Sequence, residues 1–405
     1  MSAESAPAGV AALQRLEDRY AMPTYARAPV HFVRGEGCRA WDSDGRQYLD
    51  FFSGLSVHNA GHCHPRIVAA ISEQAATFAG SSNLFYSEPA MRLHERLSEL
   101  GLGGRGFLCN SGTEANECAI KLVRKRAHLR GIDEPRIIVL EGGFHGRTLG
   151  SLAATVKLAR PELFGPLPAG FVAVPPDDAE ALRAAVGPST AAVMLEPVLG
   201  EAGVYPISDQ VLVAAREACD AVGALLVFDE IQTGMGRTGT LWAYQGGPVV
   251  PDLITAAKAL GGGLPVGACL SAPSVGEGLT IGDHGSTFAG GPIGARAALA
   301  TLELLSDPDL LASVRSLGAL LGERCAAIEG VVEVRRRGLM LGLGLAPGIE
   351  SGAVAAAALE RGLIVNAPNG ETIRLLPPLV ISEEEITRGV DLLVAALEAA
   401  AASRA

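Results

Sequence analysis

Short apolar runs alternate with helical patterns through the middle of the chain. The runs lie at residues 106–112, 136–143, 171–176, 191–197 and 224–230. They are apolar along their whole length, which is typical of strands that are covered on both faces. A helical pattern over 208–222 separates the last two runs. This repetition predicts an α/β fold with right-handed crossovers and a parallel or mostly parallel sheet.

The two ends of the chain follow different patterns. Residues 30–52 alternate apolar and polar positions around the Asp44-Gly45 turn, which predicts a hairpin. Beyond about residue 300, helical patterns over 294–327 and 384–402 bracket short apolar runs and predict a smaller α+β lobe. We therefore expect three parts: an N-terminal segment that joins the small domain (1–54), a large domain (55–305) and a C-terminal small domain (306–405).

Composition narrows the class of protein. Of the 405 residues, 48% are hydrophobic and 19% are charged, which fits a globular protein with a large core and two or more lobes. The net charge of -11 argues against a nucleic-acid partner, because phosphates attract basic surfaces. Apolar runs of about 18 residues do not occur, so we expect no membrane helix.

The cysteines favour a reducing compartment. There are seven of them, an odd number scattered along the chain without a C-x-x-C pair, as expected for free thiols. The first twenty residues lack the basic start and apolar core of a signal peptide. We therefore expect the protein in the cytoplasm.

The stretch His62-Cys63-His64 resembles a metal-binding cluster at first sight. Alternate residues of an extended segment point to opposite sides, and no further ligands follow at a suitable spacing. The sequence therefore predicts no metal site.

The stretch "FDEIQTGMGRTG" (228–239) contains a G-x-G-x-x-G pattern. Four residues separate the end of the preceding strand from the first glycine, and no helical pattern follows the last one. A dinucleotide site needs a tight strand-to-helix turn and an acidic residue well after the glycines, so this context argues against NAD. Asp229 is more informative, because a buried carboxylate at the end of a strand needs a cation. A core arginine or lysine, a helix cap or a ligand would each meet that need.

Two further stretches suggest a phosphate and a reactive amine. Ser111-Gly112-Thr113 lies between a strand and a helix, where backbone N–H groups bind phosphate, although the same residues also fit a simple N-cap. Lys258 is flanked by apolar residues and followed by three glycines. A desolvated lysine loses its proton readily and can form a Schiff base, and the alternative is an ordinary lysine at a helix end.

A fourth stretch, "EGGFHGRTLG" (141–150), follows a predicted strand. Phe144 could stack on a ring, and Arg147 offers a fork for a carboxylate. The alternative is a packed phenylalanine beside a surface arginine.

Together these stretches resemble the class III aminotransferases, a branch of the pyridoxal-phosphate enzymes of fold type I. The resemblance rests on "NSGTEAN", "FHGRTLG", "FDEIQTGMGRTG" and "HGSTFAGGP" in this order and spacing, and it extends from about residue 25 to residue 381. It implies a large domain with a mostly parallel seven-stranded sheet and a smaller α+β domain.

The resemblance also implies roles around the cofactor. Lys258 would carry the Schiff base with pyridoxal phosphate, and Asp229 would pair with the ring nitrogen, which answers its need for a cation. Gln232 would bind the ring hydroxyl. The ring faces and the phosphate would contact Phe144, Ile231, Ser111, Gly112 and Thr113. Ser286 and Thr287 would complete the site from the partner subunit, which implies a homodimer.

The resemblance also implies that two arginines bind different substrates. Arg147 would bind the α-carboxylate of the donor and Arg374 a carboxylate of the acceptor, 2-oxoglutarate. Glu201 would pair with Arg374 while the donor is bound. Tyr25 would lie near the substrate. Glu196 would lie behind the residues that contact the cofactor and the substrate.

The implied donor is N-acetylornithine. Leu55 falls where ornithine-specific relatives carry a tyrosine, and an apolar residue there suits a blocked amine. The family's pattern is also broken at Leu199 and Ala259, although neither change removes a catalytic group. Other ω-amine donors stay open, namely ornithine, succinylornithine, succinyldiaminopimelate and 4-aminobutyrate, and so does a pyridoxal-phosphate aminomutase.

Overall fold

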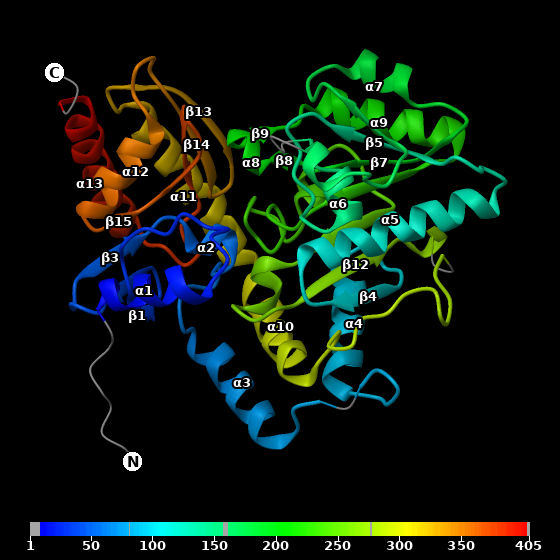
Figure 1. Ribbon diagram of the computed structural model, residues 1–405, viewed down its shortest axis with the longest axis horizontal. Coiled ribbons are helices and arrows are strands. Elements are labelled where there is room, and N and C mark those ends of the chain that lie inside the picture. Colours follow the sequence, from blue (N-terminus) through cyan, green and yellow to red (C-terminus); the bar gives the residue numbers. More distant parts are fainter. Residues whose placement is uncertain (1–8, 81, 157–160, 276–277, 403–405) are drawn as a thin grey trace.

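Two lobes make up the molecule in a computed structural model that describes residues 9–80, 82–156, 161–275 and 278–402. The larger lobe, built around a wide sheet, occupies the right side of Figure 1. The smaller lobe combines the C-terminal part of the chain with strands from near the N-terminus (Figure 1).

A seven-stranded sheet forms the centre of the larger lobe. Its strands, in spatial order, are β4 (Gly106–Cys109), β12 (Gly267–Ser271), β11 (Leu253–Ala256), β10 (Leu225–Asp229), β7 (Thr190–Leu195), β5 (Arg136–Leu140) and β6 (Phe171–Val174). Of these, β12 runs antiparallel to both neighbours, and the other pairings are parallel. The predicted mostly parallel sheet is therefore confirmed.

The apolar pattern did not predict β11 and β12. Both are short, and β12 begins with Gly267-Ala268, residues of low β propensity. Tertiary pairing with β4 and β10 makes them strands.

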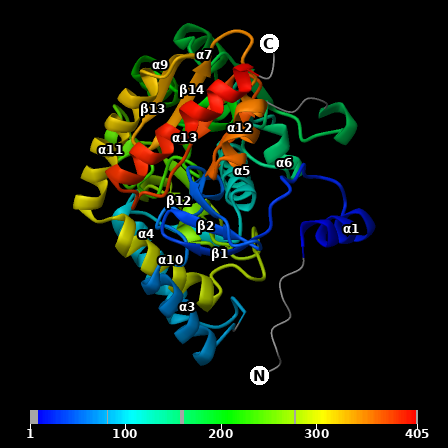
Figure 2. The same cartoon turned by 90° about the vertical axis from the view of Figure 1, so that its left-hand side faces the viewer.

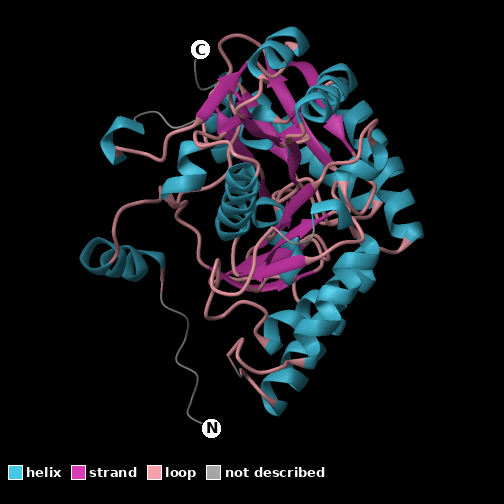
Figure 3. Cartoon of the chain, turned by 90° about the vertical axis from the view of Figure 1, so that its right-hand side faces the viewer, coloured by secondary structure: helices cyan, strands magenta, loops and turns pink. Residues whose placement is uncertain are grey.

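Helices cover both faces of this sheet (Figure 3). On one face α5 (Gly112–Leu129) packs against β4, β7, β10, β11 and β12, and on the other α7 (Ala179–Ala185) and α9 (Asp209–Val222) pack against β6, β7 and β10. Along β5, Ile137 and Val139 belong to the α5 core, whereas Ile138 and Leu140 belong to the core on the opposite face. Burial on both faces explains why these strands are apolar at every position.

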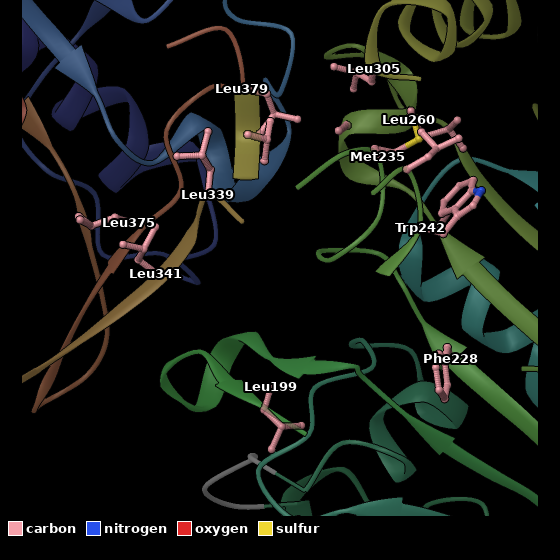
Figure 4. Close-up of a cluster of buried hydrophobic side chains, with 14 of the residues drawn as sticks. Leu199, Phe228, Met235, Trp242, Leu260, Leu305, Leu339, Leu341, Leu375 and Leu379 are labelled. Atoms are coloured by element: carbon pink, nitrogen blue, oxygen red, sulfur yellow. The ribbon is translucent and has the colours of Figure 1, made fainter. Parts of the chain in front are cut away.

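The smaller lobe has its own antiparallel sheet. Its strands are β13 (Val331–Arg337), β14 (Met340–Leu345), β17 (Thr372–Leu375) and β16 (Asn366–Asn369). Its helices are α11 (Pro308–Ala326), α12 (Ser351–Glu360) and α13 (Glu383–Ala402). Leu341 and Leu375, from neighbouring strands, meet in the buried core of this lobe (Figure 4).

The helical pattern over 294–327 is two helices rather than one. α10 (Pro292–Leu305) ends before Ser306, and α11 starts at Pro308. The Asp307 side chain accepts hydrogen bonds from the backbone N–H groups of Asp309 and Leu310, so it caps the second helix. Proline at the first helical position completes the break.

The N-terminal segment joins the smaller lobe through a sheet. Strands β2 (Arg39–Asp42) and β3 (Gln47–Asp50) form the predicted hairpin around Asp44-Gly45. Strand β1 (Phe32–Glu36) pairs antiparallel with β2, and β3 also pairs in parallel with β15 (Leu363–Ile364). Ahead of them, α1 (Val10–Tyr20) has no buried residue and stands apart from the body of the molecule (Figures 2 and 3).

The remaining elements connect these layers. The helices are α2 (Ser53–Ser56), α3 (Pro65–Thr77), α4 (Glu88–Leu100), α6 (Leu149–Ala153) and α8 (Gly200–Gly203); the strands are β8 (Val198–Leu199) and β9 (Tyr205–Pro206); and short 3-10 turns lie at Pro161–Phe164, Ala243–Gly246, Lys258–Gly261 and Pro273–Val275. Within the ranges that the structure describes, no helix is long and apolar enough to cross a membrane.

A buried arginine ties both lobes to the strained α2 turn. Residues 53–56 all have positive φ angles between 43° and 67°, so this short segment is a left-handed turn. Arg237 is fully buried and donates to the hydroxyl groups of Ser53 and Ser56 and to the carbonyl oxygens of Leu339 and Pro377. The glycine-rich turn that carries Arg237 is largely buried within the chain.

Candidate active site

The carboxyl ends of the parallel strands converge on one cavity. This is where ligands of open α/β sheets bind, and the cavity here measures about 480 Å³. Ten of the residues predicted for the site line it: Ser111, Gly112, Thr113, Phe144, Arg147, Glu201, Asp229, Ile231, Gln232 and Lys258.

Asp229 forms the base of the cavity at the last residue of β10. Its Oδ2 accepts hydrogen bonds from Asn116 Nδ2 and His145 Nδ1, both at 2.8 Å, and its Oδ1 accepts one from the Ile231 backbone N–H at 3.1 Å. Among the described ion pairs, Asp229 pairs with His145 and with no lysine or arginine. The predicted alternative of a core salt bridge to arginine or lysine is therefore wrong.

His145 and Glu196 share this buried environment. The Asp229 carboxylate raises the pKa of His145 despite the opposing effect of burial. Burial raises the pKa of Glu196 to about 7, and the Glu196 carboxylate accepts a hydrogen bond from the Phe144 backbone N–H at 2.9 Å. His145 Nε2 is buried without a hydrogen-bond partner in the described part of the chain. A proton can therefore be retained in this group of side chains near neutral pH.

Lys258 follows β11 in a strained backbone conformation. Its φ angle is +46°, which is uncommon for a residue with a side chain and costs free energy that the surrounding fold must supply. Burial lowers the pKa of the Lys258 amine, with the charges of Glu201 and Arg374 acting in opposite directions. Because a desolvated amine gives up its proton more readily, Lys258 is prepared to act as a nucleophile.

The N-terminus of α5 forms one wall of the cavity. Ser111 caps the helix by accepting a hydrogen bond from the Glu114 backbone N–H, so the predicted N-cap is present. Gly112 and Thr113, the first two helical residues, line the cavity, so the phosphate-binding alternative is open as well. A Cβ atom at Gly112 would lie 2.7 Å from Ile231 Cδ1, which explains the need for glycine.

Phe144 and Ile231 lie on two loops that flank Asp229. Arg147 is exposed at the cavity, and its guanidinium lies 5.3 Å from the centre of the Phe144 ring. No carboxylate in the described part of the chain forms an ion pair with Arg147. A free cation is therefore available beside an aromatic wall.

A second arginine, Arg374, is buried behind residues that line the cavity. Arg374 in β17 is 1% exposed and does not line the cavity. Its Nη1 donates to Glu201 Oε1 at 2.7 Å and to Gln232 Oε1 at 3.3 Å. Gly200 permits this arrangement, because a Cβ atom there would overlap the Gln232 amide. Glu201 and Gln232 thus separate Arg374 from the cavity.

Besides Arg374, four residues that the sequence analysis singled out lie outside this cavity. Tyr25 is 72% exposed and belongs to the N-terminal segment. Ser286 lies against its own chain, where its hydroxyl contacts Asn110 Nδ2 at 2.9 Å, and Thr287 is exposed on the neighbouring surface. Leu55 is half-buried in the left-handed turn and does not line the cavity, whereas Val57 does. A single chain does not bring these residues to the cofactor region.

Three polar residues that contact the predicted site residues were not predicted from the sequence: Asn116, His145 and Asn366. Asn116 bridges Asp229, the His145 carbonyl oxygen and Thr255, and His145 contacts Asp229 directly. Asn366 holds the guanidinium of Arg374. Asn116 and His145 stand inside the stretches "NSGTEAN" and "FHGRTLG", whereas nothing in the sequence pattern points to Asn366. Among the described residues, no cluster of potential ligands could hold a metal ion.

The fold and the cavity define a pyridoxal-phosphate enzyme of fold type I. The fit rests on three groups that line the cavity: the part-buried Lys258 amine, which has no hydrogen-bond partner in the described chain, the buried Asp229 carboxylate, whose Oδ1 has one donor, and the N-terminus of the long helix α5. These groups match an aldehyde, a ring nitrogen and a phosphate.

Comparison with known proteins agrees with this class. The class-III aminotransferase family model matches residues 20–397, and the chain therefore belongs to the class III aminotransferases. It is 48% identical to an acetylornithine aminotransferase of Xylella fastidiosa strain Temecula1, over 94% of this chain and 95% of that protein.

Solved structures show the same likeness. An ornithine aminotransferase from Toxoplasma gondii ME49 superposes with a TM-score of 0.93 at 31% identity, covering 98% of this chain and 97% of that one. An N-acetylornithine aminotransferase from Stenotrophomonas maltophilia K279a superposes with a TM-score of 0.83 at 39% identity, covering 96% and 99%. The family, the fold and the enzyme class predicted from the sequence are confirmed.

Proposed function

We propose that the chain transfers the terminal amino group of N-acetylornithine to 2-oxoglutarate, a step of arginine biosynthesis in the cytoplasm. The observation that carries this proposal is the pair of unlike arginines, Arg147 free at the cavity and Arg374 masked by Glu201. A donor with one carboxylate and a neutral tail needs one free cation, whereas a dicarboxylate acceptor needs two. The relatives named above support the choice of donor.

Pyridoxal phosphate, when bound, supplies an aldehyde that takes up amino groups and a protonated ring that withdraws electrons. Lys258 would hold the cofactor between turnovers and then act as base and acid on the carbon that bears the substrate's amino group. Asp229, held by His145 and Asn116, would keep the ring nitrogen protonated. Gln232 would bind the ring hydroxyl.

The remaining residues would hold and orient the reactants. Phe144 and Ile231 would cover the two ring faces, and Ser111, Gly112 and Thr113 would bind the phosphate at the N-terminus of α5. Arg147 would bind the donor's α-carboxylate. Glu201 would release Arg374 when the acceptor arrives, so that one cavity serves both substrates.

We also propose that the active form is a homodimer. Large apolar side chains that a second copy could cover lie exposed next to the cavity, among them Leu84, Phe85, Tyr86 and Phe288. The α1 helix has no buried residue in a single chain. Thr287 and Tyr25 could then act at the partner's cavity, and Ser286 could line its substrate end.

The donor can be identified by comparing kcat/KM for N-acetylornithine, ornithine, succinylornithine and 4-aminobutyrate, each with 2-oxoglutarate. We expect N-acetylornithine to give the highest value. Equal or better use of free ornithine would contradict the proposed donor. Turnover without added 2-oxoglutarate would instead indicate an aminomutase.

A further inference from the structure

The guanidinium of Arg374 has two kinds of partner. On one side its Nη1 donates to Glu201 Oε1 at 2.7 Å, Gly200 O at 3.0 Å and Gln232 Oε1 at 3.3 Å. On the other side Nε and Nη2 both donate to Asn366 Oδ1, at 3.1 and 2.7 Å. Because guanidinium nitrogens only donate, the Asn366 amide must present its oxygen to them.

The small-domain sheet fixes this second contact. Asn366 in β16 stands directly opposite Arg374 in β17 in the antiparallel register. Side chains of such a pair project to the same face and lie within contact distance. Neither residue needs a mobile loop to reach the other, whereas Glu201 belongs to the four-residue helix α8.

The two partners differ in charge. The Nε–Nη2 edge is the edge on which an arginine holds a carboxylate with two parallel hydrogen bonds. Here a neutral amide oxygen occupies it, so Glu201 is the only carboxylate paired with Arg374 among the described residues. The contact between Asn366 and Arg374 does not involve Glu201, and it brings no negative charge to the guanidinium.

We propose that Asn366 is a positioning and specificity-determining residue for the acceptor. It holds the plane of the Arg374 guanidinium during the exchange of Glu201 for the acceptor's carboxylate, and its neutrality leaves the charge of Arg374 available to that carboxylate. A carboxylate at position 366 would neutralise Arg374 permanently and favour the donor over the acceptor. This inference rests on the proposed function, in which Arg374 meets the acceptor.

The test is to measure the two half-reactions separately in the Asn366→Asp holoenzyme by single-turnover absorbance of the cofactor. We expect kcat/KM for 2-oxoglutarate to fall by more than about tenfold, since close charge pairs couple this strongly. We expect kcat/KM for N-acetylornithine to stay within about twofold of wild type, because the donor half-reaction does not use the charge of Arg374. A loss in the acceptor half-reaction without a loss in the donor half-reaction distinguishes this role from general structural damage, which would slow both.

Two variants control for structure and for charge. Asn366→Ala removes the oxygen without adding charge, and we expect a smaller loss for 2-oxoglutarate than with Asn366→Asp. Asn369→Asp adds the same charge to the same strand, but the Asn369 side chain contacts Ala202 O and the Glu371 backbone N–H rather than Arg374. We expect this control to retain wild-type acceptor kinetics within about twofold.

Several outcomes would overturn the proposal. Equal losses in both half-reactions, equal losses in the alanine and aspartate variants, or the same acceptor defect in Asn369→Asp would each show that Asn366 acts only through folding or general charge. If Asn366→Asp does not fold, an unchanged acceptor half-reaction in Asn366→Ala would contradict the positioning role. A wild-type enzyme that fails to react with N-acetylornithine would instead refute the proposed function, so the two failures are distinguishable.

Discussion

At the residue scale, the site depends on carboxyl groups that the fold removes from water. Asp229 accepts hydrogen bonds from three donors, whereas the Glu196 carboxylate accepts one from the Phe144 backbone N–H and has a pKa of about 7. Burial is the main cause of the higher pKa, and the nearby Asp229 charge adds to it. Burial and hydrogen bonding therefore act differently on two neighbouring carboxyl groups: hydrogen bonds hold Asp229, whereas burial raises the pKa of Glu196.

The raised pKa of Glu196 predicts a pH-dependent stability difference. The folded state holds the Glu196 proton up to about pH 7, whereas the unfolded state loses it near 4.5, so the contribution of Glu196 to the free energy of unfolding falls as pH rises through this window. Glutamine keeps the oxygen that accepts from Phe144 but does not titrate. We expect Glu196→Gln to gain about 1–3 kcal/mol relative to wild type between pH 5 and pH 8.

This prediction is checked by urea unfolding of the two cofactor-free proteins at both pH values. Glu230 has a pKa raised by burial in the same direction, but it is present in both proteins and cancels in the difference. A difference between the two proteins that does not change from pH 5 to pH 8 would contradict the interpretation.

At the scale of the element, α2 is a left-handed turn rather than a right-handed helix. Leu55 has φ 64° and ψ 47°, and its neighbours in the turn also have positive φ. The left-handed conformation costs roughly 1–2 kcal/mol for a residue with a Cβ atom. The hydrogen bonds from Arg237 to Ser53 and Ser56 offset that cost and place the adjacent Val57 against the cavity.

Replacing Leu55 by alanine and by glycine tests the handedness of this turn. Both changes remove the same side-chain contacts, so the comparison isolates the backbone. We expect Leu55→Gly to be more stable than Leu55→Ala by about 1 kcal/mol, because glycine adopts positive φ without a steric cost. In a right-handed helix the order would be reversed. Denaturant unfolding measures the difference in stability between the two variants. A more stable alanine variant would refute the left-handed turn.

At the scale of the whole molecule, one chain leaves its cavity next to a large apolar surface. Thr287 and Phe288 are exposed there, and α1 stands away from the body (Figure 2). A shared site predicts that two inactive chains can restore each other. Lys258→Ala would lack the reactive amine, and Thr287→Glu would repel the partner's phosphate.

We expect co-expression of these two variants to restore about one quarter of the wild-type activity. Half of the randomly paired dimers would be hybrids, and each hybrid would contain one site with both Lys258 and Thr287 intact. Each variant expressed alone serves as the control. Activity of the mixture no greater than the sum of the two controls would contradict a site shared across the dimer.

The apolar runs predicted β4, β5, β6, β7 and β10, because strands covered on both faces must be apolar. They did not predict β11 and β12, two short strands that are held by pairing with each other and with β10 and β4. The division into segments 1–54, 55–305 and 306–405 stays a prediction, although β3 and β15 do join the two ends of the chain.

By itself, the sequence determined the fold class, the family and ten of the residues that line the cavity. It could do so because Lys258, Asp229 and the Gly112 turn must each carry a fixed chemistry at a fixed place relative to a strand end. Only the tertiary structure decided which groups hold them: His145 on Asp229, Glu201 over Arg374, and Asn366 across the strand pair. These contacts join residues up to 173 positions apart, and a local pattern does not encode which distant side chain will satisfy a buried charge.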